Sequence, residues 1–109
     1  MIGEIGALVS VESPSRDVDR VTASASALAQ LITAETGLTV ELVDSAVGPH
    51  VVVRATSRPA VLFLGHHDTV HPAGTLAQRP FTNANGELRG PGVFDMKAGI
   101  VQAVAAVRI

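Results

Sequence analysis

The spacing of hydrophobic positions predicts one long helix in the amino-terminal half of the chain. Across residues 16–36 the apolar side chains recur at three- and four-residue steps, which is typical of a buried helical stripe. These positions are Val18, Val21, Ala25, Leu28, Ala29 and Ile32. Ser15 or Asp17 can cap the start, because a short side-chain oxygen accepts an otherwise unpaired first-turn N–H. Gly37 stands where a left-handed residue can end the helix.

Helical patterns also occur at the two ends of the chain. The mildly apolar residues 2–11 lead into residues 12–15 (ESPS), which indicate a helix exit, a turn and a new helix start. Residues 95–109 place apolar side chains on one face and Asp95 near the amino-terminal end. We therefore expect a last helix over residues 95–109.

Between these helices, three segments have the pattern of strands. Residues 38–43 alternate apolar and polar, residues 50–55 contain consecutive valines, and residues 60–64 are continuously apolar. A continuous apolar run favours a strand covered on both faces, as in the middle of a mostly parallel sheet. Asn85-Gly86 predicts a short hairpin within the Gly- and Pro-rich residues 71–93. The prediction is an α/β fold, with a mostly parallel mixed sheet flanked by helices.

Composition narrows the classes of function. The 109 residues correspond to one small domain or part of a larger one. A net charge of −2 with eight scattered Lys and Arg favours neither nucleic acid nor anionic lipid as a partner. The absence of cysteine excludes disulfides, thiolate zinc sites and a Cys nucleophile. No apolar stretch approaches the ~20 residues of a membrane span. The amino terminus also lacks the basic n-region of a secretory signal, so we expect a cytoplasmic setting.

His66, Asp68 and Asp95 are the candidate site residues. His66 and Asp68 follow the apolar run, and α/β proteins keep ligands at the carboxyl ends of strands. A metal-bound imidazole commonly donates its second N–H to a carboxylate, and Asp68 is placed to accept it. Residues 90–92 (GPG) allow a tight turn that points Asp95 back at the strand end. Ligation by His and carboxylate suits zinc, cobalt or manganese.

Simpler interpretations exist for each of these residues. His66 and Asp68 alone also fit a hydrogen-bonded surface pair, and Asp95 alone fits a helix N-cap. Lys97 is expected to be solvated, and pairing with a nearby carboxylate is the alternative. His67 fits a packed or solvent-facing position on the opposite side of the strand end. The remaining histidines, His50 and His71, fit a strand start and a loop.

Two ordered motifs resemble the amino-terminal part of the zinc exopeptidase and deacylase family. They are residues 62–70 (LFLGHHDTV) and 90–99 (GPGVFDMKAG), with GTL at 74–76 and RPF at 79–81 between them. The family includes glutamate carboxypeptidase, acetylornithine deacetylase and succinyl-diaminopimelate desuccinylase. The Pro-Phe element and Gly-Pro-Gly are most similar to the glutamate carboxypeptidase branch.

The resemblance implies a function and a role for each site residue. His66 would bind one Zn²⁺, Asp68 would be the catalytic-site carboxylate that orients His66, and Asp95 would bridge two metals, often with a cis peptide after it. Such enzymes hydrolyse a peptide or an N-acyl amino acid with a metal-activated water. Two Zn²⁺ occupy a complete site, and Co²⁺ or Mn²⁺ can replace them.

The family's paired glutamates, distal histidine ligand and lid domain have no counterpart in this sequence. The last predicted helix also has no polar stop before Ile109. We therefore expect residues 1–109 to be the amino-terminal part of a metallopeptidase catalytic domain, inactive alone. One alternative is a non-catalytic module with weak metal binding, either a folded remnant or a module that self-associates as a homo-oligomer. Another is a nucleotide-binding α/β domain. The latter is disfavoured because the phosphate-binding glycine motifs are missing.

Overall fold

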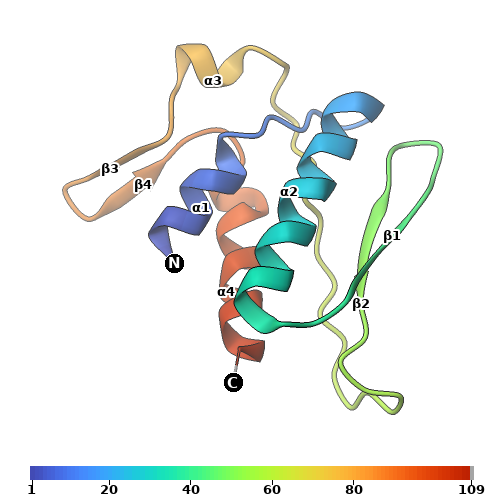
Figure 1. Ribbon diagram of the computed structural model, residues 1–109. Coiled ribbons are helices and arrows are strands. Elements are labelled where there is room, and N and C mark those ends of the chain that lie inside the picture. The colour runs from blue at the N-terminus through green and yellow to red at the C-terminus, as the bar shows by residue number, and fades with distance from the viewer. Residues whose placement is uncertain (109) are drawn as a thin grey trace.

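The computed structural model describes residues 1–108 and combines helices with short strands (Figure 1). The helices are α1 (Ile2–Val9), α2 (Val18–Thr36), α3 (Thr75–Gln78) and α4 (Ala98–Val107), and an irregular helical turn, η1 (Val93–Lys97), precedes α4. The strands are β1 (Val40–Val43), β2 (His50–Val53), β3 (Thr82–Ala84) and β4 (Glu87–Arg89). None of the helices in this described part is long and apolar enough to cross a membrane.

The long helix predicted for residues 16–36 is confirmed as α2. Asp17 is its N-cap, and its side chain accepts a hydrogen bond of 3.2 Å from the backbone N–H of Arg20. Gly37 ends the helix with a φ of 71°, in the left-handed region that glycine adopts without steric cost. Of the two predicted cap residues, Asp17 therefore caps the helix, and the hydroxyl of Ser15 has other partners.

The core lies where α1, α2 and α4 pack together (Figure 1). Its buried members are apolar side chains from these three helices and η1: Ile5, Leu8, Val9, Leu28, Ile32, Val93, Val101 and Val104. Each helix hydrogen-bonds its own backbone, so it needs a neighbour only along one apolar face. The three helices supply that neighbour for one another.

The strands form two separate antiparallel hairpins. β1 pairs with β2 from Val40 opposite Val53 to Val43 opposite His50. β3 pairs with β4, and Asn85 and Gly86 connect them with φ values of 53° and 76°. Two consecutive positive φ values are typical of the tight turn that Asn-Gly favours, so the predicted hairpin is confirmed.

The prediction of a buried strand at residues 60–64 is wrong for this structure. The segment has no strand pairing among residues 1–108, and Leu62 and Leu64 are 83% and 88% exposed. The expected mostly parallel sheet is likewise not formed by the described residues, whose parallel pairing is an isolated bridge between Pro14 and Thr69. A strand needs a neighbour to supply hydrogen bonds, and β1 and β2 use each other instead.

The last helix begins later than its sequence pattern predicts. Asp95 and Met96 have non-helical backbone angles, with φ/ψ of −122°/92° and −139°/31°, and the regular helix α4 starts at Ala98. The predicted end at Ile109 lies outside the described residues. The break leaves Asp95 outside the regular helix, where its side chain can turn toward another segment.

Candidate functional site

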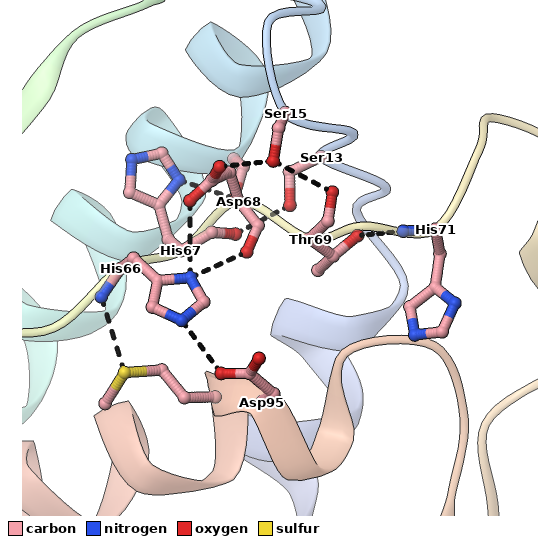
Figure 2. Close-up of polar contacts among 10 residues, drawn as sticks. Ser13, Ser15, His66, His67, Asp68, Thr69, His71 and Asp95 are labelled. Atoms are coloured by element: carbon pink, nitrogen blue, oxygen red, sulfur yellow. Dashed lines mark hydrogen bonds and ion pairs between the residues drawn. The ribbon is translucent and has the colours of Figure 1, made fainter.

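The backbone near the site is held by two segments that are far apart in sequence. Thr69 N–H donates to the carbonyl of Ser13 (2.8 Å), and Ser15 N–H donates to the carbonyl of Thr69 (2.9 Å). The buried Ser13 also donates its hydroxyl to the carbonyl of His67 (2.7 Å). These bonds fix residues 67–69 against residues 13–15 (Figure 2).

The structure brings His66, Asp68 and Asp95 together. His66 Nε2 lies 2.8 Å from Asp95 Oδ1. The other ring nitrogen, Nδ1, donates to the backbone carbonyl of Asp68 (3.0 Å) and lies 3.3 Å from its carboxylate oxygen Oδ1. Figure 2 shows the imidazole of His66 between the two aspartates. Both nitrogens therefore face oxygen atoms, and the ring has a defined orientation.

The charges of this cluster favour a cation. Burial opposes protonation of His66, but hydrogen bonds to the Asp68 carbonyl and the Asp95 carboxylate, together with both negative charges, raise its pKa above the ordinary value. The Ser15 hydroxyl, which donates to Asp68 Oδ2 at 2.5 Å, is the main reason that the pKa of Asp68 is lowered, and the charge of His66 adds to it. The carboxylate of Asp68 therefore remains ionised beside the imidazole.

The chain around Asp95 is fitted closely against the His66 segment. The peptide bond between Asp95 and Met96 is cis. Met96 Sδ accepts a 3.4 Å hydrogen bond from the backbone N–H of His66. Gly92 has a φ of 80°, and a Cβ at this position would lie 2.6 Å from Thr69 Cγ2. A side chain at position 92 would therefore push η1 away from the segment that contains His66.

Lys97 anchors the same turn to α1, contrary to the expectation that it is solvated. Its side chain is 1% exposed, and Nζ donates to the carbonyls of Leu8 (2.9 Å) and Val11 (2.7 Å). Burial lowers the pKa of Lys97 to about 8, although the negative charge of Glu12 acts to raise it. Nothing in the spacing of the sequence indicates this role, because both acceptors are backbone carbonyls from a distant segment.

The other histidines lie outside the cluster. His67 Nδ1 lies 3.1 Å from the Ser24 hydroxyl of α2, and burial lowers the pKa of this imidazole. Figure 2 shows the His67 and His71 rings away from the Asp95 carboxylate. The Nδ1 atom of His71 lies 3.3 Å from a guanidinium nitrogen of Arg79, and His50 begins β2.

His66 and Asp95 have the chemistry of a partial metal site. Among residues 1–108, no group of three or more His, Asp or Glu side chains is arranged to hold a metal ion. Two ligand atoms on a tetrahedral zinc lie about 3.3 Å apart, so the 2.8 Å between Nε2 and Oδ1 needs only a small adjustment. The bond from Nδ1 to the backbone carbonyl of Asp68, rather than to the carboxylate predicted as its acceptor, orients the ring as in metal-bound histidines. The residues fit two ligands of such a site, one fewer than the three protein ligands that a catalytic zinc normally has.

A comparison with protein families identifies the segment that contains this cluster. Residues 62–109 match the family model described as peptidase family M20/M25/M40. The match includes His66, Asp68 and Asp95, and it confirms the resemblance seen in the two motifs. A search of curated proteins finds no match.

Proposed function

We propose that this chain contributes part of a metal-dependent site that hydrolyses peptide or amide bonds. Its residues 62–109 match the model of peptidase family M20/M25/M40. The observation that supports this proposal is the 2.8 Å contact between His66 Nε2 and Asp95 Oδ1 inside the matched segment. The Asp95 side chain is 71% exposed, so core packing does not account for its position. An exposed carboxylate directed at an imidazole by an irregular turn is more consistent with a ligand site than with a structural contact.

In this proposal each side chain has one task. His66 and Asp95 would hold Zn²⁺, or Co²⁺ or Mn²⁺. Asp68 orients His66 through its backbone carbonyl, which accepts from Nδ1, and its carboxylate lies 3.3 Å from the same nitrogen. When bound, the metal polarises the scissile carbonyl and makes water a stronger nucleophile at neutral pH. The substrate is a small peptide or an N-acyl amino acid, as for a carboxypeptidase or a deacylase.

Catalysis needs groups besides these three. A catalytic zinc normally has three protein ligands, and the cluster in residues 1–108 offers two. We therefore propose that residues 1–109 act as the amino-terminal part of a catalytic domain, and that another segment or chain supplies the remaining ligands and the general base. On its own this chain binds metal without turning over substrate.

A second candidate function is a non-catalytic module that self-associates. The observation that favours it is the exposed apolar segment 61–64, in which even the least exposed side chain, Phe63, is 58% exposed. Contiguous exposed apolar side chains commonly mark interaction surfaces. A homo-oligomer with weak zinc binding would support this function over the first.

Calorimetry with Zn²⁺ tests the proposed site directly. We expect the chain to bind with a Kd on the order of micromolar, and Asp95→Ala to weaken binding at least about 10-fold. Asp44→Ala, which removes an exposed carboxylate outside the cluster, is the matched control and should bind like the unmodified chain. Circular dichroism confirms that each variant is folded. The proposal would be contradicted if the folded chain does not bind zinc, or if Asp95→Ala binds zinc as tightly as the unmodified chain.

Activity provides the second test. We expect no hydrolysis of peptides or N-acyl amino acids by this chain alone. In any longer or assembled form that does hydrolyse them, His66→Ala and Asp95→Ala should each abolish turnover. Retained turnover in either variant would exclude the assigned roles.

A further inference from the structure

Ser15 makes a contact that its position in the sequence does not explain. Its hydroxyl donates to Asp68 Oδ2 at 2.5 Å, and the carbonyl of Thr69 is a more distant acceptor at 3.2 Å (Figure 2). A hydroxyl has one hydrogen to donate, and the short bond to a charged carboxylate is the stronger of the two. Because Asp17 caps α2, Ser15 is not needed for that purpose.

The backbone holds Ser15 in place for this contact. Its N–H donates to the carbonyl of Thr69 at 2.9 Å, and Thr69 N–H donates to the carbonyl of Ser13 at 2.8 Å. These two bonds align residues 13–15 with residues 67–69 in parallel. The Ser15 hydroxyl is therefore presented to Asp68 by a fixed main chain, although the side chain itself is solvent-accessible.

We propose that Ser15 is a positioning residue of the site, because its hydroxyl holds the Asp68 carboxylate beside the Nδ1 edge of the His66 ring, where its negative charge favours hydrogen on Nδ1. With Oδ2 bound to Ser15, the other oxygen, Oδ1, stays 3.3 Å from His66 Nδ1. Hydrogen on Nδ1 leaves the lone pair of Nε2 directed toward Asp95, where a metal would bind. A line of contacts thus runs from Ser15 through Asp68 and His66 to Asp95.

Ser15 lies outside the motifs and outside the segment that matches the family model. The motifs that resemble the family begin at residue 62, and the family match also begins there, so neither includes Ser15. The inference rests on the proposed function where it concerns metal binding. Its geometric part, the orientation of Asp68, can be measured without any metal.

The first experiment measures the side-chain rotamer of Asp68 in the metal-free chain by three-bond NMR couplings. We expect one χ1 rotamer in the unmodified chain and averaging over several rotamers in Ser15→Ala. Ser15→Thr keeps a hydroxyl and should restore the single rotamer. Ser10→Ala removes an exposed hydroxyl that bonds to the carbonyl of Gly6 at 2.7 Å, and it should leave Asp68 unchanged. An unaltered Asp68 rotamer in Ser15→Ala would overturn the proposal.

The second experiment uses zinc calorimetry as a double-mutant cycle. We expect Ser15→Ala to weaken Zn²⁺ binding by roughly 3- to 10-fold, less than the loss of a residue that touches the ligand directly. In an Asp68→Asn background the same change should have little further effect, because Ser15 acts through that carboxylate. A similar loss in both backgrounds, or unchanged affinity despite a mobile Asp68, would overturn the positioning role. If the unmodified chain binds no zinc, the proposed function fails, and the rotamer measurement still decides whether Ser15 orients Asp68.

Discussion

Helix α1 and residues 60–64 are both short and apolar, but α1 is packed into the core and residues 60–64 are exposed. α1 buries Leu8 and Val9 to 4% and 1% exposure, whereas Leu64 in the second segment is 88% exposed. A helix satisfies its own backbone and needs cover along one face, which α2 and α4 provide. An extended apolar segment needs neighbours for its backbone and for both faces. Hydrophobic composition therefore predicts burial only where a suitable partner is present.

After Gly65 the same segment makes polar contacts with other parts of the chain. Residues 67–69 are held by hydrogen bonds to residues 13–15, and His66 is held by Asp68, Asp95 and Met96. Polar contacts thus hold the site in place, although the apolar residues 60–64 just before it are exposed. Apolar burial of residues 60–64 is therefore not what positions the site residues that follow Gly65.

Truncating one leucine in each segment should give the largest difference. Leu8→Ala removes a core side chain and leaves a cavity, so we expect it to lower the free energy of unfolding by about 2–5 kcal/mol. Leu64→Ala should change it by no more than about 0.5 kcal/mol, because that side chain is exposed. Urea unfolding followed by circular dichroism measures both. Equal losses would mean that residues 60–64 are buried in solution.

Removing the polar anchor between η1 and α1 should have a smaller effect. Lys97→Met leaves the carbonyl of Val11 without its Nζ donor and the carbonyl of Leu8 with only the N–H of Val11 (3.2 Å), and we expect a loss of about 1–3 kcal/mol. Arg54→Gln, which removes an exposed cation paired with Glu41 on β1, is the control and should be nearly neutral. The same urea unfolding measures both variants. A neutral Lys97→Met would show that the buried ammonium does not stabilise this end of α1.

The smallest effect should come from Glu12 and should depend on pH. Its carboxylate accepts from the N–H groups of Gly74 (3.0 Å) and Leu76 (2.8 Å), and these bonds lower its pKa below the ordinary 4.5. A lowered carboxyl pKa means that the ionised form stabilises the fold above pH 4.5, and that this stabilisation disappears as pH falls through the folded-state pKa.

We therefore expect Glu12→Gln to be less stable than the unmodified chain at pH 7, by about 1 kcal/mol, with the difference vanishing in acid. Unfolding by urea at several pH values between 7 and 3 measures the convergence. A difference between the two chains that is independent of pH would contradict the contribution of the ionised carboxylate.

Local signals in the sequence predicted much of the fold and the composition of the candidate site. The helix from Val18 to Thr36, its Asp17 cap and the Asn85-Gly86 hairpin depend on residues a few positions apart, and all are present. The motifs also singled out His66, Asp68 and Asp95, which the structure brings together, although their roles remain predictions.

The tertiary structure alone decided which distant groups meet. Ser15 and Asp68 are 53 positions apart, and Lys97 and the Leu8 carbonyl are 89 apart, so no periodic pattern links them. Tertiary structure also decided that residues 60–64 are exposed, since a strand forms only where another segment pairs with it. Side-chain periodicity and turn chemistry act over a few residues and can be seen in the sequence. Hydrogen bonds and strand pairing between distant segments depend on how the whole chain folds back on itself.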